Sequence, residues 1–155
     1  MKKNKYTSIE KIIQLTKKGK MFILVDDEKR ENEGDLVIST SYSNPKNINF
    51  MAKYGRGLIC MALDTAQAKK LNLTLMSSVN ISRNPKTAFT VSIEAKKGVT
   101  TGISAKDRAH TIKVASKKNV NKNDIISPGH VFPIIAKDGG VLVRAGHTEA
   151  SVDIS

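Results

Sequence analysis

The segment DDEKRENEGD, residues 26–35, limits what this chain can fold into more than any other part of it. It holds six carboxylates and two cations, and apolar runs flank it directly, MFILV before it and LVIS after it. Carboxylates buried without a partner are costly or take up a proton, so the segment cannot simply enter a core. Taken alone, it is best explained as a solvated turn between strands. A divalent cation, with Arg30 neutralising part of the charge, is the alternative.

Short apolar runs and amphipathic stretches alternate along the chain. Strands are predicted at 21–25 (buried), 35–40, 57–63, 87–95, 130–137 and 141–146, the last two joined as a hairpin by DGG, and a loop at 71–86. Helices are predicted after a Thr7–Glu10 capping box, from Pro45 to Gly55, from an Asp64 cap to Leu71, after a Ser104 cap, and from residue 147 onwards. We therefore expect an α+β fold, a single domain over residues 1–155 with a mixed β-sheet flanked by helices.

The charge of the chain narrows the choice of partner. Its formal net charge is +12, which can indicate nucleic-acid binding, but 21 of the 26 cations are Lys, spread along the chain without interleaved aromatic residues. Four of the five Arg lie instead in Gly-rich or acidic stretches, as expected where a planar, bidentate donor is needed: Arg30, Arg56, Arg108 and Arg144. An anionic small molecule is therefore a better-supported partner than nucleic acid.

Membrane and secretion features are missing from the sequence as given. No apolar run approaches the roughly 20 residues of a membrane span, and the basic N-terminus has no apolar core of a secretion signal. Cys60 is the single cysteine, which excludes an internal disulfide. Its place in the apolar run GLICMAL is typical of a core residue or of one that lines a pocket. We expect a cytoplasmic protein with no membrane partner.

Two further stretches could carry chemistry. GVTTGISAKDR, residues 98–108, places Gly, Thr and Ser before a helix N-terminus, where N–H groups and hydroxyls can bind phosphate; a capped structural loop explains it about as well. His130 in SPGHVFP and His147 in RAGHTEA each follow a Gly. A His in such a place is often structural, but the neighbouring Arg144 and Thr148 favour a metal or phosphate role.

Together these stretches resemble a known enzyme family. DDEKRENEGD, GRGLIC, TAFTVSIEA, GVTTGISAKDRAHTI and PGHVFPIIAKDGGVLVRAGHTEASVD, in this order and spacing, are similar to the 3,4-dihydroxy-2-butanone-4-phosphate synthases of riboflavin biosynthesis, from about Ile9 to Ser155. The resemblance implies conversion of D-ribulose 5-phosphate into 3,4-dihydroxy-2-butanone 4-phosphate and formate. It also implies Mg²⁺ or Mn²⁺ as cofactor and a homodimer with active sites near the subunit interface.

The resemblance also implies roles for single residues. The Glu after Arg in RENEGD and the His of GHTEA are metal ligands, here Glu31 and His147. The His of PGHVFP, His130, is implied to be catalytic, and Thr101 to contact phosphate. The substrate-binding positions correspond to Arg30, Glu31, Asp35, Thr101, Arg144, Ala145, Gly146, His147 and Thr148, and further acidic pocket positions to Asp26 and Glu33. We expect the substrate phosphate among Arg144, Thr148 and the 98–104 loop.

Family members continue past the GHTEA helix, in a tail that carries a further catalytic Glu next to a Cys. Since the sequence given ends at Ser155, we expect a fragment or a shortened relative that lacks the family's C-terminal part and is poorly active by itself. The alternative to the enzyme is a non-catalytic sugar-phosphate-binding relative or an inactive fragment. A fusion of the parent protein to GTP cyclohydrolase II stays open.

Overall fold

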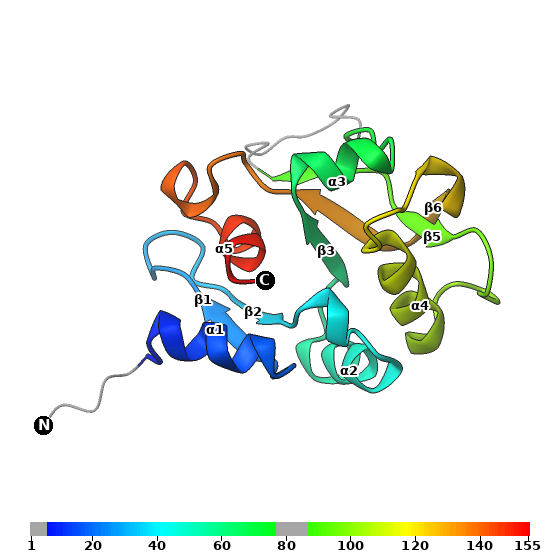
Figure 1. The fold of residues 1–155 in the computed structure, drawn as a ribbon. Helices are drawn as coiled ribbons and strands as arrows, with labels where there is room; N and C mark the ends of the chain where they lie inside the picture. Colours follow the sequence, from blue (N-terminus) through cyan, green and yellow to red (C-terminus); the bar gives the residue numbers. More distant parts are fainter. Residues whose placement is uncertain (1–5, 77–86) are drawn as a thin grey trace, which may run out of the picture.

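The computed structural model describes residues 6–76 and 87–155, and its architecture is α+β, as the sequence predicts (Figure 1). Its strands are β1 (Phe22–Val25), β2 (Gly34–Val37), β3 (Cys60–Leu63), β4 (Ala88–Phe89), β5 (Ile93–Ala95) and β6 (Ile125–Ile135). β1 and β2 form an antiparallel pair. The second sheet is mixed, because β6 runs parallel to β3 and antiparallel to β4 and β5. The expected mixed sheet is confirmed.

Five α-helices flank the strands in the described part of the chain. They are α1 (Ile9–Lys17), α2 (Pro45–Phe50), which continues as the π-helical turn η2 (Met51–Gly55), α3 (Thr65–Lys70), α4 (Ala105–Ala115) and α5 (His147–Ile154); short 3₁₀ turns are η1 (Thr40–Tyr42), η3 (Lys122–Asp124) and η4 (Gly140–Leu142). The predicted caps, Asp64 of α3 and Ser104 of α4, are confirmed by hydrogen bonds from the first turn of each helix. The predicted Thr7 cap is wrong, because Ser8 accepts the hydrogen bond from the N–H of Lys11.

Within the described ranges, no helix combines the length and the apolar character needed to cross a membrane.

The main core lies between the mixed sheet and the two helices α2 and α4, which pack against each other. Its buried side chains include Ile48, Met61, Leu63, Ile93, Ala109, Ile112 and Val131. The β1–β2 pair and α1 lie to one side of this core, and α5 contacts both α1 and β3 (Figure 1). Helix α5 is therefore placed where the β1–β2 pair and the main sheet approach each other.

The expected burial of the run at 21–25 is wrong. Ile23 and Val25 are 65% and 47% exposed, whereas Phe22 and Leu24 are half-buried. Among the described strands, β1 pairs only with β2. Its residues alternate between half-buried and exposed, so one face of this pair is covered. A continuous apolar run is typical of a strand buried on both faces. Whether another element packs on the second face depends on the tertiary structure, and here Ile23 and Val25 on that face are exposed.

The strand predicted at 141–146, and with it the DGG hairpin, is also wrong. DGG forms a turn with positive φ at both glycines, and η4 follows it. The N–H of Val141 donates to the Asp153 carboxylate (2.9 Å) and the N–H of Lys137 to the Glu149 carboxylate (3.0 Å). Two carboxylates of α5 thus take hydrogen bonds that a partner strand would have taken.

The strand predicted at 87–95 is interrupted. It forms as β4 and β5, and Thr90 between them makes an isolated antiparallel bridge with Leu75. The loop predicted at 71–86 falls partly on residues 77–86, which lie outside the described residues.

Asp107 ties the 98–104 loop to α4. Its carboxylate is 2% exposed and accepts hydrogen bonds from the Thr100 hydroxyl (2.8 Å) and the Gly102 N–H (3.1 Å). The Thr100 hydrogen bond is the largest influence and outweighs the opposing effect of burial, so the pKa of the Asp107 carboxyl lies below its ordinary value. The carboxylate therefore stabilises the fold above its ordinary pKa, and this stabilisation is lost as pH falls through the folded-state pKa.

We expect Asp107→Asn to lower the free energy of unfolding at neutral pH, because the amide replaces a charged acceptor of two hydrogen bonds. The difference from wild type should shrink on acidification, as the wild-type carboxylate becomes protonated. Urea unfolding at neutral pH and below the ordinary carboxyl range measures both effects. Lys106→Ala, an exposed change in the same helical turn, is the control. An Asp107→Asn deficit that is equally large at both pH values would contradict this account.

Candidate metal centre and substrate site

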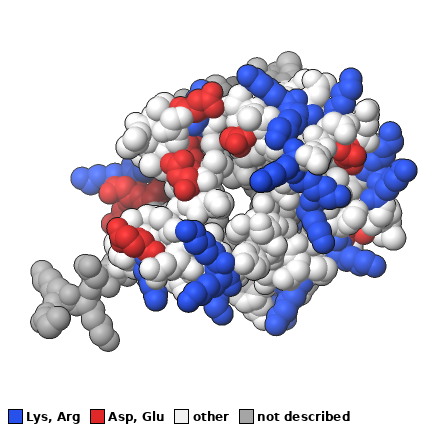
Figure 2. All heavy atoms as spheres, in the orientation of Figure 1, with Lys and Arg blue, Asp and Glu red and all other residues white. Residues whose placement is uncertain are grey.

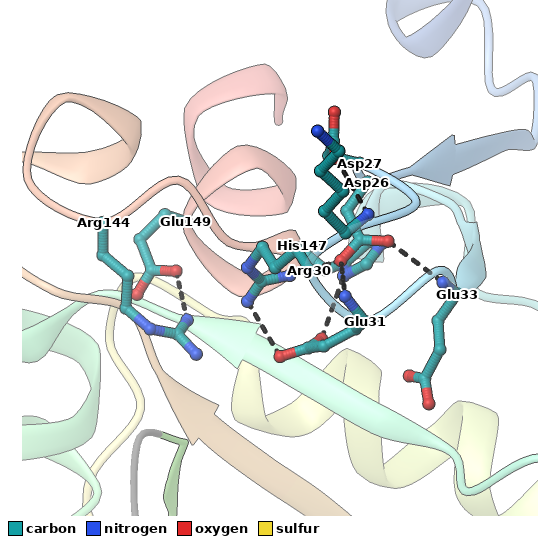
Figure 3. Close-up of polar contacts among 9 residues, drawn as sticks. Asp26, Asp27, Arg30, Glu31, Glu33, Arg144, His147 and Glu149 are labelled. Atoms are coloured by element: carbon teal, nitrogen blue, oxygen red, sulfur yellow. Dashed lines mark hydrogen bonds and ion pairs between the residues drawn. The ribbon is translucent and has the colours of Figure 1, made fainter.

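The charged run forms a loop that folds around one of its own carboxylates. The Asp26 side chain, 9% exposed, accepts hydrogen bonds from the Arg30 guanidinium (2.7 Å) and from the N–H groups of Glu31 (3.1 Å) and Glu33 (3.0 Å) (Figure 3). Burial raises the pKa of the Asp26 carboxyl, but these donors outweigh it and hold the pKa below its ordinary value. The loop is therefore an ordered structure with an ionised carboxylate at its centre, and not a plain solvated turn.

Asp26, Glu31 and His147 bring ligand atoms together although they are distant in the sequence. One ligand atom from each residue lies within 4.8 Å of the other two. The Nδ1 of His147 and the Oε2 of Glu31 are 3.8 Å apart, too far for a hydrogen bond. Two ligands that each lie about 2.1 Å from a shared Mg²⁺ ion are roughly 3–4 Å apart, so this spacing suits a bridging ion.

The His147 ring is largely buried beside the carboxylates of this group. Its side chain is 10% exposed, and its buried Nε2 has no hydrogen-bond partner among the described residues. A cation shared with Glu31 would bind Nδ1, the ring nitrogen that faces that carboxylate, and not Nε2. A neutral imidazole nitrogen beside a carboxylate is a donor set that a divalent cation accepts. The residues present therefore fit a divalent cation.

Arg144 and Glu149 form a buried ion pair next to this group. The Arg144 Nη1 and the Glu149 Oε2 are 2.6 Å apart, with Glu149 1% and the Arg144 side chain 19% exposed (Figure 3). Burial raises the pKa of the Glu149 carboxyl, but hydrogen bonds from the Lys137 N–H and from Arg144 outweigh it, and the pKa lies below its ordinary value. A Cβ at Gly146 would meet the ends of both side chains, so a larger residue there would displace the pair. One guanidinium nitrogen is thereby engaged, and among the described residues the other N–H donors of Arg144 have no hydrogen-bond partner.

A cavity of about 540 Å³ adjoins the metal-ligand group, between β2 and β3 and alongside α5. Asp35, His147 and Thr148 line it, and Cys60 faces it from β3. Burial, with a smaller effect of Asp35, raises the pKa of the Cys60 thiol to about 11, so the thiol stays protonated at neutral pH. Figure 2 shows acidic side chains gathered on the side of the β1–β2 loop and α5, while Lys and Arg spread over the side of α3 and α4.

His130 and Thr101 do not lie with this group. His130 is in β6 and contacts Glu94 of β5, and Thr101 is exposed in the loop before α4. In the described part of the chain, no hydrogen bond or ion pair joins them to Arg30, Glu31 or His147. The predicted site residues of one chain thus fall into two groups. The first is Arg30, Glu31, Asp35 and 144–148, and the second is Thr101 and His130.

Sequence reasoning missed three contributions. Asp26 was expected as an acidic pocket residue, and it also organises the charged loop. Glu94 was not singled out, because the alternation in VSIEA places it with Ser92 on the polar face of the predicted strand, and its burial depends on tertiary packing. Glu149 was not assigned to the predicted site, and its burial against Arg144 and the Lys137 N–H depends on the packing of α5, which the sequence pattern does not show.

Comparison with known proteins gives one consistent result. Residues 10–155 match the sequence model of the family described as 3,4-dihydroxy-2-butanone 4-phosphate synthase. The chain is 51% identical to the synthase of Photobacterium phosphoreum, covering 96% of this chain and 41% of that protein. It is 53% identical to a riboflavin biosynthesis protein, RibBA, of Aquifex aeolicus, covering 97% and 37%. The chain thus spans about two-fifths of the length of these curated relatives.

Solved structures show the same fold. A two-domain 3,4-dihydroxy-2-butanone 4-phosphate synthase from A. baumannii superposes with a TM-score of 0.89 at 47% identity, covering 96% of this chain and 43% of that one. A second synthase, in complex with two magnesium ions, superposes with a TM-score of 0.90 at 38% identity, covering 96% and 69%.

Proposed function

Because the chain belongs to the 3,4-dihydroxy-2-butanone 4-phosphate synthase family, we propose that it acts in riboflavin biosynthesis, converting D-ribulose 5-phosphate into 3,4-dihydroxy-2-butanone 4-phosphate and formate. The observation that carries this proposal is the convergence of Glu31 and His147 beside the cavity, with Asp26 next to them. A cytoplasmic setting, in which Cys60 stays a thiol, belongs to the same proposal.

A divalent cation, Mg²⁺ or Mn²⁺, is held by Glu31 and His147. The magnesium ions in the related synthase structure support this. When bound, the cation supplies a Lewis acid that polarises adjacent oxygens of the ketose. Two protein ligands suit a cation that keeps water molecules and takes further oxygens from the substrate. Asp26 holds the loop, and through it Glu31, in the ligating position.

The remaining residues of this group bind the substrate. Arg30 is fixed by Asp26 and Glu31 at 2.7 and 2.9 Å, so its guanidinium faces the metal group with a defined orientation. Arg144, whose one nitrogen is held by Glu149, offers its other donors to the phosphate. Thr148 and Asp35 line the cavity and can bind hydroxyl groups of the sugar. The first N–H groups of α5, at His147 and Thr148, are further donors, since the first turn of a helix leaves them without an intrahelical partner.

His130 moves protons, and Thr101 contacts the phosphate, from across the interface of a homodimer. The separation of the two residue groups within one chain is what favours this arrangement. Exposed apolar residues next to the metal group support it, because Leu142 and Val143 are 95% and 65% exposed and Val141 lines a small cavity with Asp26 and His147. Apolar surface of this kind is usually covered by a partner.

The function is tested by formate release from D-ribulose 5-phosphate. We expect release with Mg²⁺, its loss on addition of EDTA, and recovery when excess Mg²⁺ is restored. Ribulose 5-phosphate binding without any formate release would contradict the proposed reaction and leave a sugar-phosphate-binding protein. Release that persists unchanged in EDTA would contradict the role of the cation.

The shared active site is tested at limiting Mg²⁺ by mixing two variants of low activity, Glu31→Gln and His130→Asn, under conditions in which subunits exchange. In a mixed dimer, one of the two sites contains an intact Glu31 and an intact His130 of the partner subunit. Formate release should therefore return to about a quarter of the wild-type value for random pairing. No recovery, with subunit exchange verified, would place both residues in the same subunit's site.

A further inference from the structure

We propose that Glu94 is the positioning residue of His130. It holds the imidazole with its proton on Nδ1, so that Nε2 is presented for proton transfer. The inference rests on the proposed function, in which His130 is the group that moves protons.

The contact between the two residues defines the tautomer. The Nδ1 of His130 and the Oε2 of Glu94 are 3.0 Å apart. An ionised carboxylate can only accept, so the Nδ1 must donate, and in the neutral ring the Nε2 then carries the lone pair. The Glu94 side chain is 11% exposed and that of His130 is 40% exposed. The buried carboxylate thus orients a ring whose other side is open to a substrate.

The 98–104 loop keeps the Glu94 carboxylate in place. Gly102 has a φ of +83°, and a Cβ at this position would overlap the Glu94 carboxyl group. The N–H of Gly102 is fixed by Asp107 at 3.1 Å. The hydrogen bond to Asp107 anchors the loop to α4. The anchored loop therefore covers the Glu94 carboxylate and restricts the movement of that side chain.

A bulge in β6 brings His130 to this carboxylate. The pairing of β5 with β6 shifts between Ile93, opposite Val131, and Glu94, opposite Ile126, so residues 127–130 bulge out of the ladder. The Gly129 N–H donates to the Ser92 hydroxyl (3.1 Å), and a Cβ at residue 129 would overlap the Ile93 backbone. The bulge therefore lies directly on β5. Bulges of this kind re-aim a side chain and occur often beside active sites.

A buried ion pair without any catalytic role would also place these atoms together. The test must therefore measure which nitrogen of the His130 ring carries the proton. In ¹⁵N-labelled protein, long-range ¹H–¹⁵N spectra distinguish the protonated from the unprotonated ring nitrogen, and His130→Asn identifies the His130 signals by their loss. We expect Nδ1 to be the protonated nitrogen in the neutral wild-type ring. In Glu94→Gln the ring should lose this fixed state and populate the Nε2–H tautomer, and Glu94→Asp should recover the wild-type state in part.

Activity measurements complete the test. Glu94→Gln should lower kcat on the order of 100-fold, the size of a general acid–base contribution, with KM and Mg²⁺ affinity close to wild type. Asp138→Asn is the matched control: its carboxylate accepts a hydrogen bond from the Thr65 hydroxyl (2.7 Å), away from His130 and from the 98–104 loop, and the change should leave the tautomer unchanged. An unaltered Nδ1–H tautomer or an unaltered kcat in Glu94→Gln would overturn the proposal. Wild-type protein that releases no formate would contradict the proposed function. The ring spectra do not depend on activity, so they test the contact between Glu94 and His130 independently of the proposed function.

Discussion

Glu31→Gln is expected to weaken Mg²⁺ binding by on the order of 100-fold, since even outer-shell partners of metal ligands contribute 10- to 100-fold. The amide keeps the shape of the side chain but removes the charge that faces His147 at 3.8 Å. Formate release should fall at least as far at limiting Mg²⁺. The fold should persist, because the Glu31 side chain is 46% exposed and its ion pair with Arg30 contributes little to stability.

Isothermal titration with Mg²⁺ measures the affinity, and urea unfolding confirms that the fold is intact. Glu28→Gln is the matched control, an identical change in the same exposed loop outside the group of Asp26, Glu31 and His147. We expect near wild-type affinity for it. Equal Mg²⁺ affinity in wild type and Glu31→Gln would remove Glu31 from the metal site.

Glu149→Gln is expected to lower the free energy of unfolding at neutral pH by about 3 kcal/mol, the lower end of the range for breaking a buried ion pair. The change leaves the Arg144 guanidinium, 19% exposed, without its counter-charge. Glutamine can still accept the hydrogen bond from the Lys137 N–H, so the loss of stability comes mainly from removing the negative charge that faces Arg144. The lower end applies because Arg144 keeps some contact with water.

Two measurements separate this explanation from a general packing defect. The double variant Arg144→Met with Glu149→Gln should recover part of the lost stability in urea unfolding, because it buries no unpaired charge. The pKa of Glu149 lies below its ordinary value, so its stabilisation is present above that value and is lost as pH falls through the folded-state pKa. The gap between wild type and Glu149→Gln should therefore close in acid. A gap that persists in acid, or a double variant less stable than the single one, would contradict the charge argument.

The parts of the fold that the sequence predicted correctly depend on neighbours close in the chain. Asp64 and Ser104 were recognised as caps because a cap bonds to a backbone N–H three residues further on. The alternation of apolar runs and amphipathic stretches predicted the α+β class for the same reason. The Ser8 cap was missed by one residue, since Thr7 and Ser8 offer the same chemistry to the same helix.

The family resemblance predicted which residue types gather at the site, and residue patterns alone left the charged run as a turn. What only the tertiary structure decided is how distant residues meet. In the tertiary structure, one face of β1 is uncovered and Ile23 is exposed. Hydrogen bonds to the carboxylates of α5 form where the sequence predicted a hairpin. The tertiary structure also set Glu31 against His147 and His130 against Glu94. A local pattern fixes the conformation of a segment, whereas the packing of separate elements decides which side chains face each other, and only that packing turns a charged loop into a candidate metal site.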